Sequence, residues 1–223
     1  MHMYSEDSLK RLLGYMYPPI HGPLSSLLAL HNTLTETALR ILLESQPEEL
    51  VIGSSISETE FSSAFADESR VLKSFPAFES WEDVDESSEM MECSASRLRS
   101  LYLIGSRVSL STLAASSVHI SCIERLVLHD IRISWSCTLN PGGLLNQLVS
   151  RLRSLEELHL SYCEWLNIDV MELWHHFLLG EAPLTLKRVF VHGVTVSAEE
   201  YRRVAEMQSK LACRGILLIF EDP

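Results

Sequence analysis

The sequence predicts an α/β solenoid, in which a parallel β-sheet forms the concave face, helices form the convex face and a helical cap covers the N-terminal end. The first observation is a recurring phrase of apolar residues. Its copies run Leu98-Leu101-Leu103-Val108, Ile123-Leu126-Leu128-Ile133, Leu155-Leu158-Leu160-Cys163 and Leu186-Val189-Val191-Val196. Residues two apart in a strand point to the same face, so each phrase supplies a short strand with one buried face. The second observation is that a stretch with helical apolar spacing follows each phrase, as expected for a stack of strand-plus-helix units.

Three segments precede this array. Residues 1–46 are predicted to form the helical N-terminal cap, because their apolar residues recur at helical spacing. Residues 47–66 read as a first, degenerate repeat, in which Ser57 and Glu60 have the spacing of a helix capping box. Residues 67–96 lose the apolar pattern and are predicted to be an acidic, disordered insertion.

Residues 97–223 are predicted to form the leucine-bearing array itself. Equivalent strand positions are separated by 25, 32 and 31 residues, at Leu101, Leu126, Leu158 and Val189. Helices should fill most of each interval, at residues 110–120, 141–152, 168–179 and 198–211, and a last strand should span 216–220. The residues expected to cap these helices at their N-termini are Ser109, Asn140, Asn167 and Ser197.

The net charge of −12 is concentrated in one part of the chain. Residues 1–96 carry 17 acidic and 5 basic side chains, a difference of −12, whereas residues 97–223 carry 13 of each. Within the first part, residues 79–92 hold seven carboxylates and no base. An acidic chain repels phosphate backbones, so no nucleic-acid partner is expected.

Apolar run lengths and cysteine usage predict the compartment. No run of eighteen apolar residues occurs, so no membrane partner is expected. The five cysteines form an odd set without a C-x-x-C pair, which predicts free thiols in a reducing compartment, cytoplasmic or nuclear. Cys122 and Cys163 in particular are predicted to be small apolar core residues.

One copy of the phrase carries a family resemblance. The run Leu155-x-x-Leu158-x-Leu160-x-x-Cys163-x-x-Leu166 resembles the leucine-rich repeat pattern L-x-x-L-x-L-x-x-N/C-x-L. The long, helix-containing repeats are similar to ribonuclease-inhibitor-like and fungal F-box-associated arrays. That resemblance implies a protein-binding solenoid and, for the F-box class, a Skp1-type adaptor. The first forty residues show no F-box, so the link to ubiquitin ligation rests on analogy.

The strand residues that alternate with the buried ones should line the concave face. Equivalent positions on neighbouring parallel strands then form rows, one apolar and aromatic and one carrying two arginines. Exposed aromatic side chains beside arginines are typical of protein interfaces. The residues predicted to bind a partner are Tyr102, Arg125, His129, His159, Arg188, Phe190 and His192.

An equally weighted alternative is that another part of the chain covers this face. The N-terminal helices or the acidic run are the candidates, and Arg125 and Arg188 could hold the acidic run when no partner is bound. On that hypothesis, deletion of residues 79–92 strengthens partner binding at low salt.

Catalytic and metal motifs are missing from the sequence. His129, His159 and His192 share the predicted face without a carboxylate or thiolate that completes a compact ligand set, so no metal site is expected. Neither G-x-S-x-G nor a phosphate-binding loop occurs, and no catalytic residue or cofactor is expected. An enzyme built from distant residues is a remote alternative.

These patterns favour a non-catalytic protein–protein interaction module that binds a protein partner on its concave sheet face. The runner-up is the substrate-recognition part of an F-box-type ubiquitin ligase receptor. A pull-down with a Skp1-type adaptor separates the two.

Overall fold

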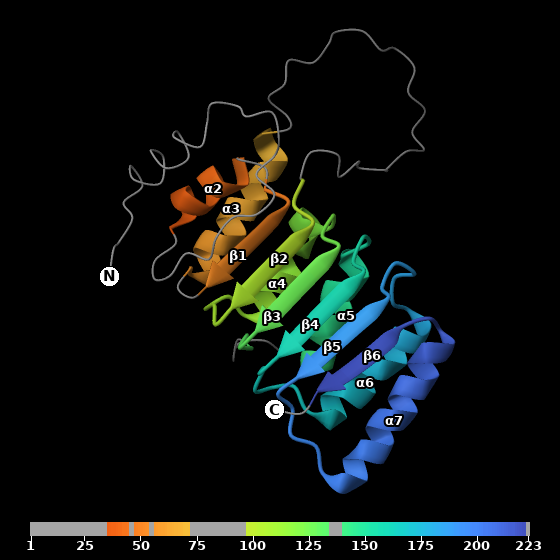
Figure 1. The fold of residues 1–223 in the computed structure, drawn as a ribbon. Coiled ribbons are helices and arrows are strands. Elements are labelled where there is room, and N and C mark those ends of the chain that lie inside the picture. The colour runs from red at the N-terminus through yellow and green to blue at the C-terminus, as the bar shows by residue number, and fades with distance from the viewer. Residues whose placement is uncertain (1–34, 45–46, 54–55, 72–96, 134–139, 222–223) are drawn as a thin grey trace, which may run out of the picture.

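The computed structural model describes residues 35–44, 47–53, 56–71, 97–133 and 140–221, which form a parallel β-sheet alternating with helices (Figure 1). The sheet has six strands: β1 (Glu49–Gly53), β2 (Ser100–Ile104), β3 (Arg125–His129), β4 (Glu157–Ser161), β5 (Arg188–His192) and β6 (Leu217–Glu221). The helices are α2 (Glu36–Glu44), α3 (Glu58–Val71), α4 (Leu110–Ser116), α5 (Pro141–Arg151), α6 (Ile168–Gly180) and α7 (Ala198–Cys213), with a 3₁₀ turn, η2 (Ser117–Ile120), after α4. The predicted α/β class and parallel sheet are confirmed.

The strands follow one another in chain order and stay in register from β1 to β6. The residues that the sequence set as equivalent, Leu101, Leu126, Leu158 and Val189, are direct partners. A shared hydrogen-bond pattern fixes this alignment at the amino ends. The Glu124 carbonyl, for example, accepts from the backbone N–H groups of both Glu156 (2.7 Å) and Glu157 (3.0 Å).

The residue that follows each of strands β2 to β5 has a left-handed backbone. The φ angles are 56° at Gly105, 53° at Asp130, 53° at Tyr162 and 77° at Gly193. In this conformation the N–H of Tyr162 donates to the carbonyl of His192 at 3.0 Å, and Asp130 and Gly105 make the equivalent bonds. Each turn therefore leaves its strand in the same way and keeps the next helix on the same side of the sheet.

The predicted helices begin at the expected caps. Ser109, Asn140 and Asn167 each accept a hydrogen bond from a backbone N–H in the first turn of the helix that follows. Ser197 forms a complete capping box with Glu200, and Ser57 forms one with Glu60 at the start of α3. These side chains satisfy N–H groups that a helix cannot pair internally.

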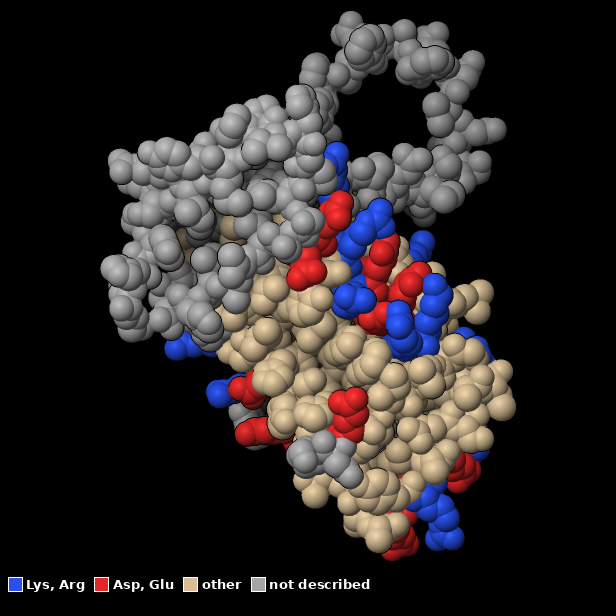
Figure 2. All heavy atoms as spheres, viewed as in Figure 1, with Lys and Arg blue, Asp and Glu red and all other residues tan. Residues whose placement is uncertain are grey.

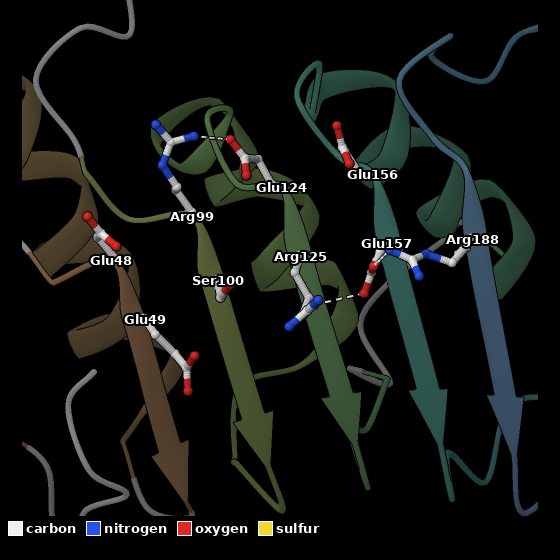
Figure 3. A pocket seen from close by; sticks show the side chains of 9 residues that line it. All are labelled: Glu48, Glu49, Arg99, Ser100, Glu124, Arg125, Glu156, Glu157 and Arg188. Carbon is white, nitrogen blue, oxygen red and sulfur yellow. Dashed lines mark hydrogen bonds and ion pairs between the residues drawn. The ribbon is translucent and has the colours of Figure 1, made fainter. Parts of the chain in front are cut away.

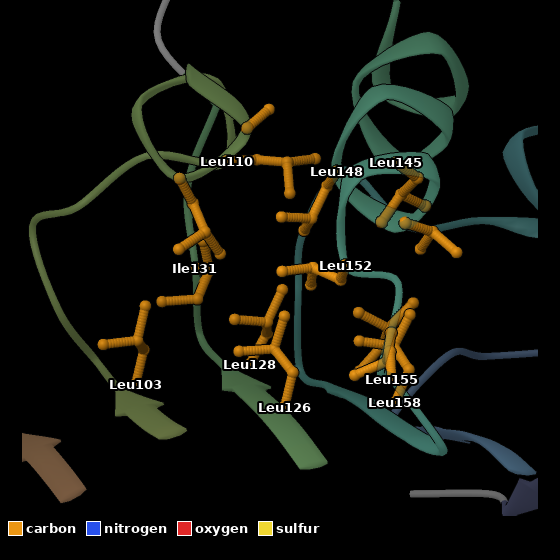
Figure 4. Packing of buried hydrophobic residues seen from close by; sticks show 14 of the residues in the cluster. Leu103, Leu110, Leu126, Leu128, Ile131, Leu145, Leu148, Leu152, Leu155 and Leu158 are labelled. Atoms are coloured by element: carbon orange, nitrogen blue, oxygen red, sulfur yellow. The ribbon is translucent and has the colours of Figure 1, made fainter. Parts of the chain in front are cut away.

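The core lies between the sheet and the helices (Figure 4). The apolar strand residues that point toward the helices, such as Leu126, Leu128 and Leu158, are completely buried. They pack against helix and turn residues such as Leu148 and Leu152. This layer contains the leucines of the repeated phrase, so those residues hold the strand and helix units together. The residues on the opposite face of the sheet are not part of this core and can vary.

Polar side chains bind backbone carbonyls of neighbouring units. Arg151 on α5 donates to the Ala114 carbonyl at 3.0 Å, and the Trp165 indole N–H donates to the Ile131 carbonyl at 2.6 Å. Arg214 donates to the Leu178 and Ala182 carbonyls. These contacts satisfy carbonyls outside the regular hydrogen bonds and join each unit to the previous one.

Several predicted segments fall partly outside the described residues. Of the predicted cap, the structure describes helix α2, which packs against α3. The degenerate repeat contributes β1 to the same sheet, and α3 continues to Val71. The acidic run at residues 79–92 lies outside the described residues, so the prediction that it is disordered stays a prediction.

The cysteine prediction needs one correction. Cys163 is buried with a free thiol, as predicted, and burial raises its pKa to about 11. Cys122, in contrast, is disulfide-bonded and only half-buried, so the expectation of a free apolar core thiol at this position is wrong. Burial patterns locate core thiols in a sequence, but pairing depends on loop geometry that spacing does not give. None of the helices within the described ranges has both the length and the apolar character to cross a membrane.

Candidate functional site

The face of the sheet turned away from the helices, here called the sheet face, carries three straight rows of side chains. In-register pairing aligns one residue per strand in each row. The amino row is Glu49, Ser100, Arg125, Glu157, Arg188 and Leu217; the middle row is Val51, Tyr102, Val127, His159, Phe190 and Ile219; the carboxyl row is Gly53, Ile104, His129, Ser161, His192 and Glu221. All seven residues predicted from the sequence lie in these rows.

The middle row is apolar and aromatic, and each of its side chains is partly accessible. The His159 and Phe190 rings stack face to face, with centroids 4.1 Å apart and planes tilted by 8°. Neighbouring strands bring Tyr102 and Val127 into the same row. Together these residues form a band of apolar surface that crosses the strands.

The amino row contains a carboxylate held between two guanidinium groups. Nε of Arg125 lies 2.8 Å from Oε2 of Glu157, and Nη2 of Arg188 is ion-paired with Oε1 of the same carboxylate. Glu157 is only 6 % exposed, whereas the side chains of Arg125 and Arg188 are 43 % and 48 % exposed. We call this cluster the Arg–Glu–Arg triad. It carries one net positive charge, and the positive groups are its accessible part.

The triad alters the protonation of its members and of His159. Burial alone would raise the pKa of Glu157, but the hydrogen bond from Arg125 and the charges of both arginines outweigh it and lower the pKa. The pKa of the Arg125 guanidinium is raised, mainly by Glu157 and also by the Tyr102 side chain. Burial lowers the pKa of His159, although its Nε2 lies 3.5 Å from the Glu157 carboxylate. His159 is therefore neutral at neutral pH and stacks on Phe190 as an aromatic ring.

A hollow of about 450 Å³ lies over the amino ends of β1 to β5 (Figure 3). All of its lining residues are polar or charged: Glu48, Glu49, Arg99, Ser100, Glu124, Arg125, Glu156, Glu157 and Arg188. Seen on the sheet face, charged side chains gather in a band over this edge, and much of the surface below the band is uncharged (Figure 2). The small side chain of Ser100 separates the acidic residues at β1 from the triad (Figure 3).

Charges beside the triad pair with one another. Arg99 is ion-paired with Glu124, and Nζ of Lys187 lies 2.9 Å from Oε1 of Glu156. Each pair joins residues of neighbouring units just outside the amino row. The triad is thus flanked by neutral ion pairs, and its own excess positive charge remains uncompensated by them.

At the carboxyl row, Tyr162 lies between two histidines. Its ring meets those of His129 and His192 edge to face, with centroid distances of 5.2 Å and 4.9 Å. The Tyr162 hydroxyl oxygen lies 2.8 Å from Nε2 of His192, and Nδ1 of His192 lies 3.5 Å from a carboxylate oxygen of Glu221. A left-handed backbone is uncommon for a tyrosine, so local contacts must hold this side chain in place.

No protein-family model and no curated protein matches this chain. The site is therefore characterised by its own geometry. Within the described residues, no three His, Cys, Asp or Glu side chains are placed to hold a metal ion together.

Sequence reasoning missed the two residues that organise this surface. Glu157 is not among the residues predicted to bind a partner, although the alternation of charges at the equivalent positions Arg125, Glu157 and Arg188 is a signal for it in the sequence. Tyr162 gave no signal, because its place depends on a left-handed backbone at an ordinary residue. Arg125 and Arg188, the two arginines that the hypothesis assigns to holding the acidic run, both already pair with Glu157.

Proposed function

We propose that this chain is a non-catalytic interaction module of the leucine-rich-repeat type, a short solenoid with a helical N-terminal cap that binds a protein partner on its sheet face. The observation that carries the proposal is the middle row. Tyr102, Val127, His159 and Phe190 form a partly accessible, apolar and aromatic band on the face opposite the described helices. Aromatic side chains beside arginines are enriched where proteins bind one another.

The arrangement supports a protein surface as the occupant. Apolar surface in a band favours a partner with an apolar strip, and the charged row alongside fixes its orientation. The hollow is open to solvent and lined by polar and charged side chains, several of which are paired along its rim. Small-molecule sites are usually enclosed and mostly apolar, so this lining suits the side chains of a protein better.

The proposal is tested by affinity capture from the native cell with three forms of the full chain. The first is unmodified, the second carries Tyr102→Ala with Phe190→Ala, and the third carries Leu173→Ala with Leu184→Ala. Leu173 and Leu184 are exposed apolar residues outside the sheet, so the third form is a matched control for lost apolar surface.

A protein captured by the first and third forms but lost from the second supports the proposal. Equal capture by all three forms contradicts it. Thermal unfolding of the second form shows whether both alanines leave the fold intact, as expected for residues that are only partly buried. If the double variant is unfolded, the single Phe190→Ala and Tyr102→Ala forms replace it.

A further inference from the structure

We propose that the element of the partner seated on the sheet face is an amphipathic helix, lying across the strands with an acidic side chain over the Arg–Glu–Arg triad. The inference rests on the proposed function, because it specifies the chemistry of the partner at the same surface. It is carried by the backbone pairing of the sheet together with the excess charge of the triad.

A helix suits this face because the backbone groups of the inner strands are already paired with neighbouring strands. A segment laid on the face receives no backbone hydrogen bonds from them, and a buried unpaired backbone group is costly. An α-helix satisfies its own N–H and carbonyl groups, whereas an extended segment would pair only at an edge of the sheet. Five spacings between six strands span about 24 Å, the length of a helix of about 16 residues.

An acidic flank is indicated by how the triad divides its charge. Glu157 is buried, accepts a hydrogen bond from Arg125 and is ion-paired with Arg188, so it offers little to a partner. Arg125 and Arg188 are nearly half exposed and retain further N–H donors, held in position by the carboxylate beneath them. A carboxylate of the partner therefore meets two preorganised donors without the cost of ordering them.

The rest of the row supports one placement of that acidic side chain. Glu48 and Glu49 line the β1 end of the same hollow and repel an anion there. The flanking pairs Arg99–Glu124 and Lys187–Glu156 are neutral overall. The acidic side chain of the helix thus belongs over β3 to β5, with its apolar stripe on the adjacent middle row.

Two stapled helical peptides of 16 residues test the inference by fluorescence anisotropy on the full chain. Both carry the same apolar stripe, and the residues along one flank are Glu in the first peptide and Lys in the second. We expect the Glu-flank peptide to bind about tenfold more tightly. This preference opposes the net charge of −12, which by itself attracts the Lys-flank peptide.

Two substitutions locate the effect. Arg188→Gln should reduce the preference for the Glu-flank peptide to below about threefold, because one of the two donors loses its charge. Lys187→Gln removes a cation from the neighbouring residue, already paired with Glu156, and should leave the preference unchanged. Both side chains are about half exposed, and thermal unfolding of each variant checks the fold.

The outcomes separate this inference from the proposed function. Equal binding of the two peptides, with both lost on Tyr102→Ala plus Phe190→Ala, overturns the acidic flank and leaves docking on the sheet face intact. Failure of both peptides to bind overturns the inference that the partner element on the sheet face is a helix. Native capture with the same double variant, described above, then decides separately whether the face binds a protein at all.

Discussion

The Cδ1 atom of Tyr162 lies 2.6 Å from the point that a Cβ atom on Gly193 would occupy. Real Cβ atoms do not approach so closely, and Gly193 also has a φ of 77°, which favours glycine. The ring of Tyr162 therefore rests on the backbone of the next unit. This contact and the hydrogen bond to His192 fix the side chain at the carboxyl edge of the sheet.

Gly193→Ala should lower the free energy of unfolding by about 2 kcal/mol, because the new methyl group adds backbone strain and displaces the Tyr162 ring. Urea unfolding measures the loss. In a Tyr162→Ala background the same substitution should cost only about 1 kcal/mol, since the steric part has gone. An equal cost in both backgrounds would show that the ring does not rest on this glycine.

Glu157→Gln should destabilise the fold by about 1–2 kcal/mol, because a buried carboxylate that accepts a hydrogen bond from Arg125 and is ion-paired with Arg188 becomes a neutral amide. The loss stays below that of a fully buried ion pair, since both arginines can be hydrated. Glu156→Gln is the control. It removes the carboxylate of the neighbouring residue, which forms an exposed ion pair with Lys187, and should cost at most about 0.5 kcal/mol. Similar losses for both variants would refute the special role of Glu157.

Stability should fall in two stages as the protein is acidified. The lowered pKa of His159 means that the unfolded chain binds its proton first, so stability is lost as the pH falls below about 6.5. The lowered pKa of Glu157 adds a loss that begins near the unfolded value of about 4.3 and continues until the folded carboxyl is protonated.

Urea unfolding between pH 3 and pH 8 follows both stages. His159→Gln should weaken the first stage without abolishing it, because burial also lowers the pKa of His175. Glu157→Gln should weaken the second stage and deepen the first, because the Glu157 carboxylate raises the pKa of His159 against the effect of burial. A pH profile unchanged by either substitution would mean that neither group couples its proton to folding.

Asn167→Ala should cost about 1 kcal/mol, because the Asn167 side chain accepts from the Val170 N–H at 2.9 Å and caps α6. Asn167→Gly is a suitable comparison, since replacing an N-cap residue by glycine lowers the free energy of unfolding by only a few tenths of about 1 kcal/mol. Thermal unfolding that ranks the glycine variant below the alanine variant would rule out capping as the source of the effect.

The strands and helices were predictable because short-range patterns specify them. Alternating leucines at residues 101 and 103 and the capping residue Ser109 each act over a few positions. The three rows were predictable for the same reason, once the strands were assumed to be parallel and in register. The placement of Tyr162 and the pairing of Cys122 depend on loop backbone geometry, which residue spacing does not encode.

The electrostatics of the site were only half predictable. The sequence places Arg125, Glu157 and Arg188 at equivalent positions, but two arginines could equally have extended into solvent. That they fold over Glu157 and bury it depends on side-chain packing across three strands, 32 and 31 residues apart in the chain.

The in-register sheet has a consequence for how this surface can evolve. Each middle-row position belongs to one strand, and its neighbours in sequence belong to the core, so a single substitution there changes one surface contact without disturbing the stack. Insertions in the connections lengthen a unit and leave the rows aligned, as the unequal spacings of 25, 32 and 31 residues already show. A one-residue deletion inside a strand instead exchanges core and surface along that strand. The sheet face can therefore change gradually by single substitutions, whereas a shift of strand register would destroy the core.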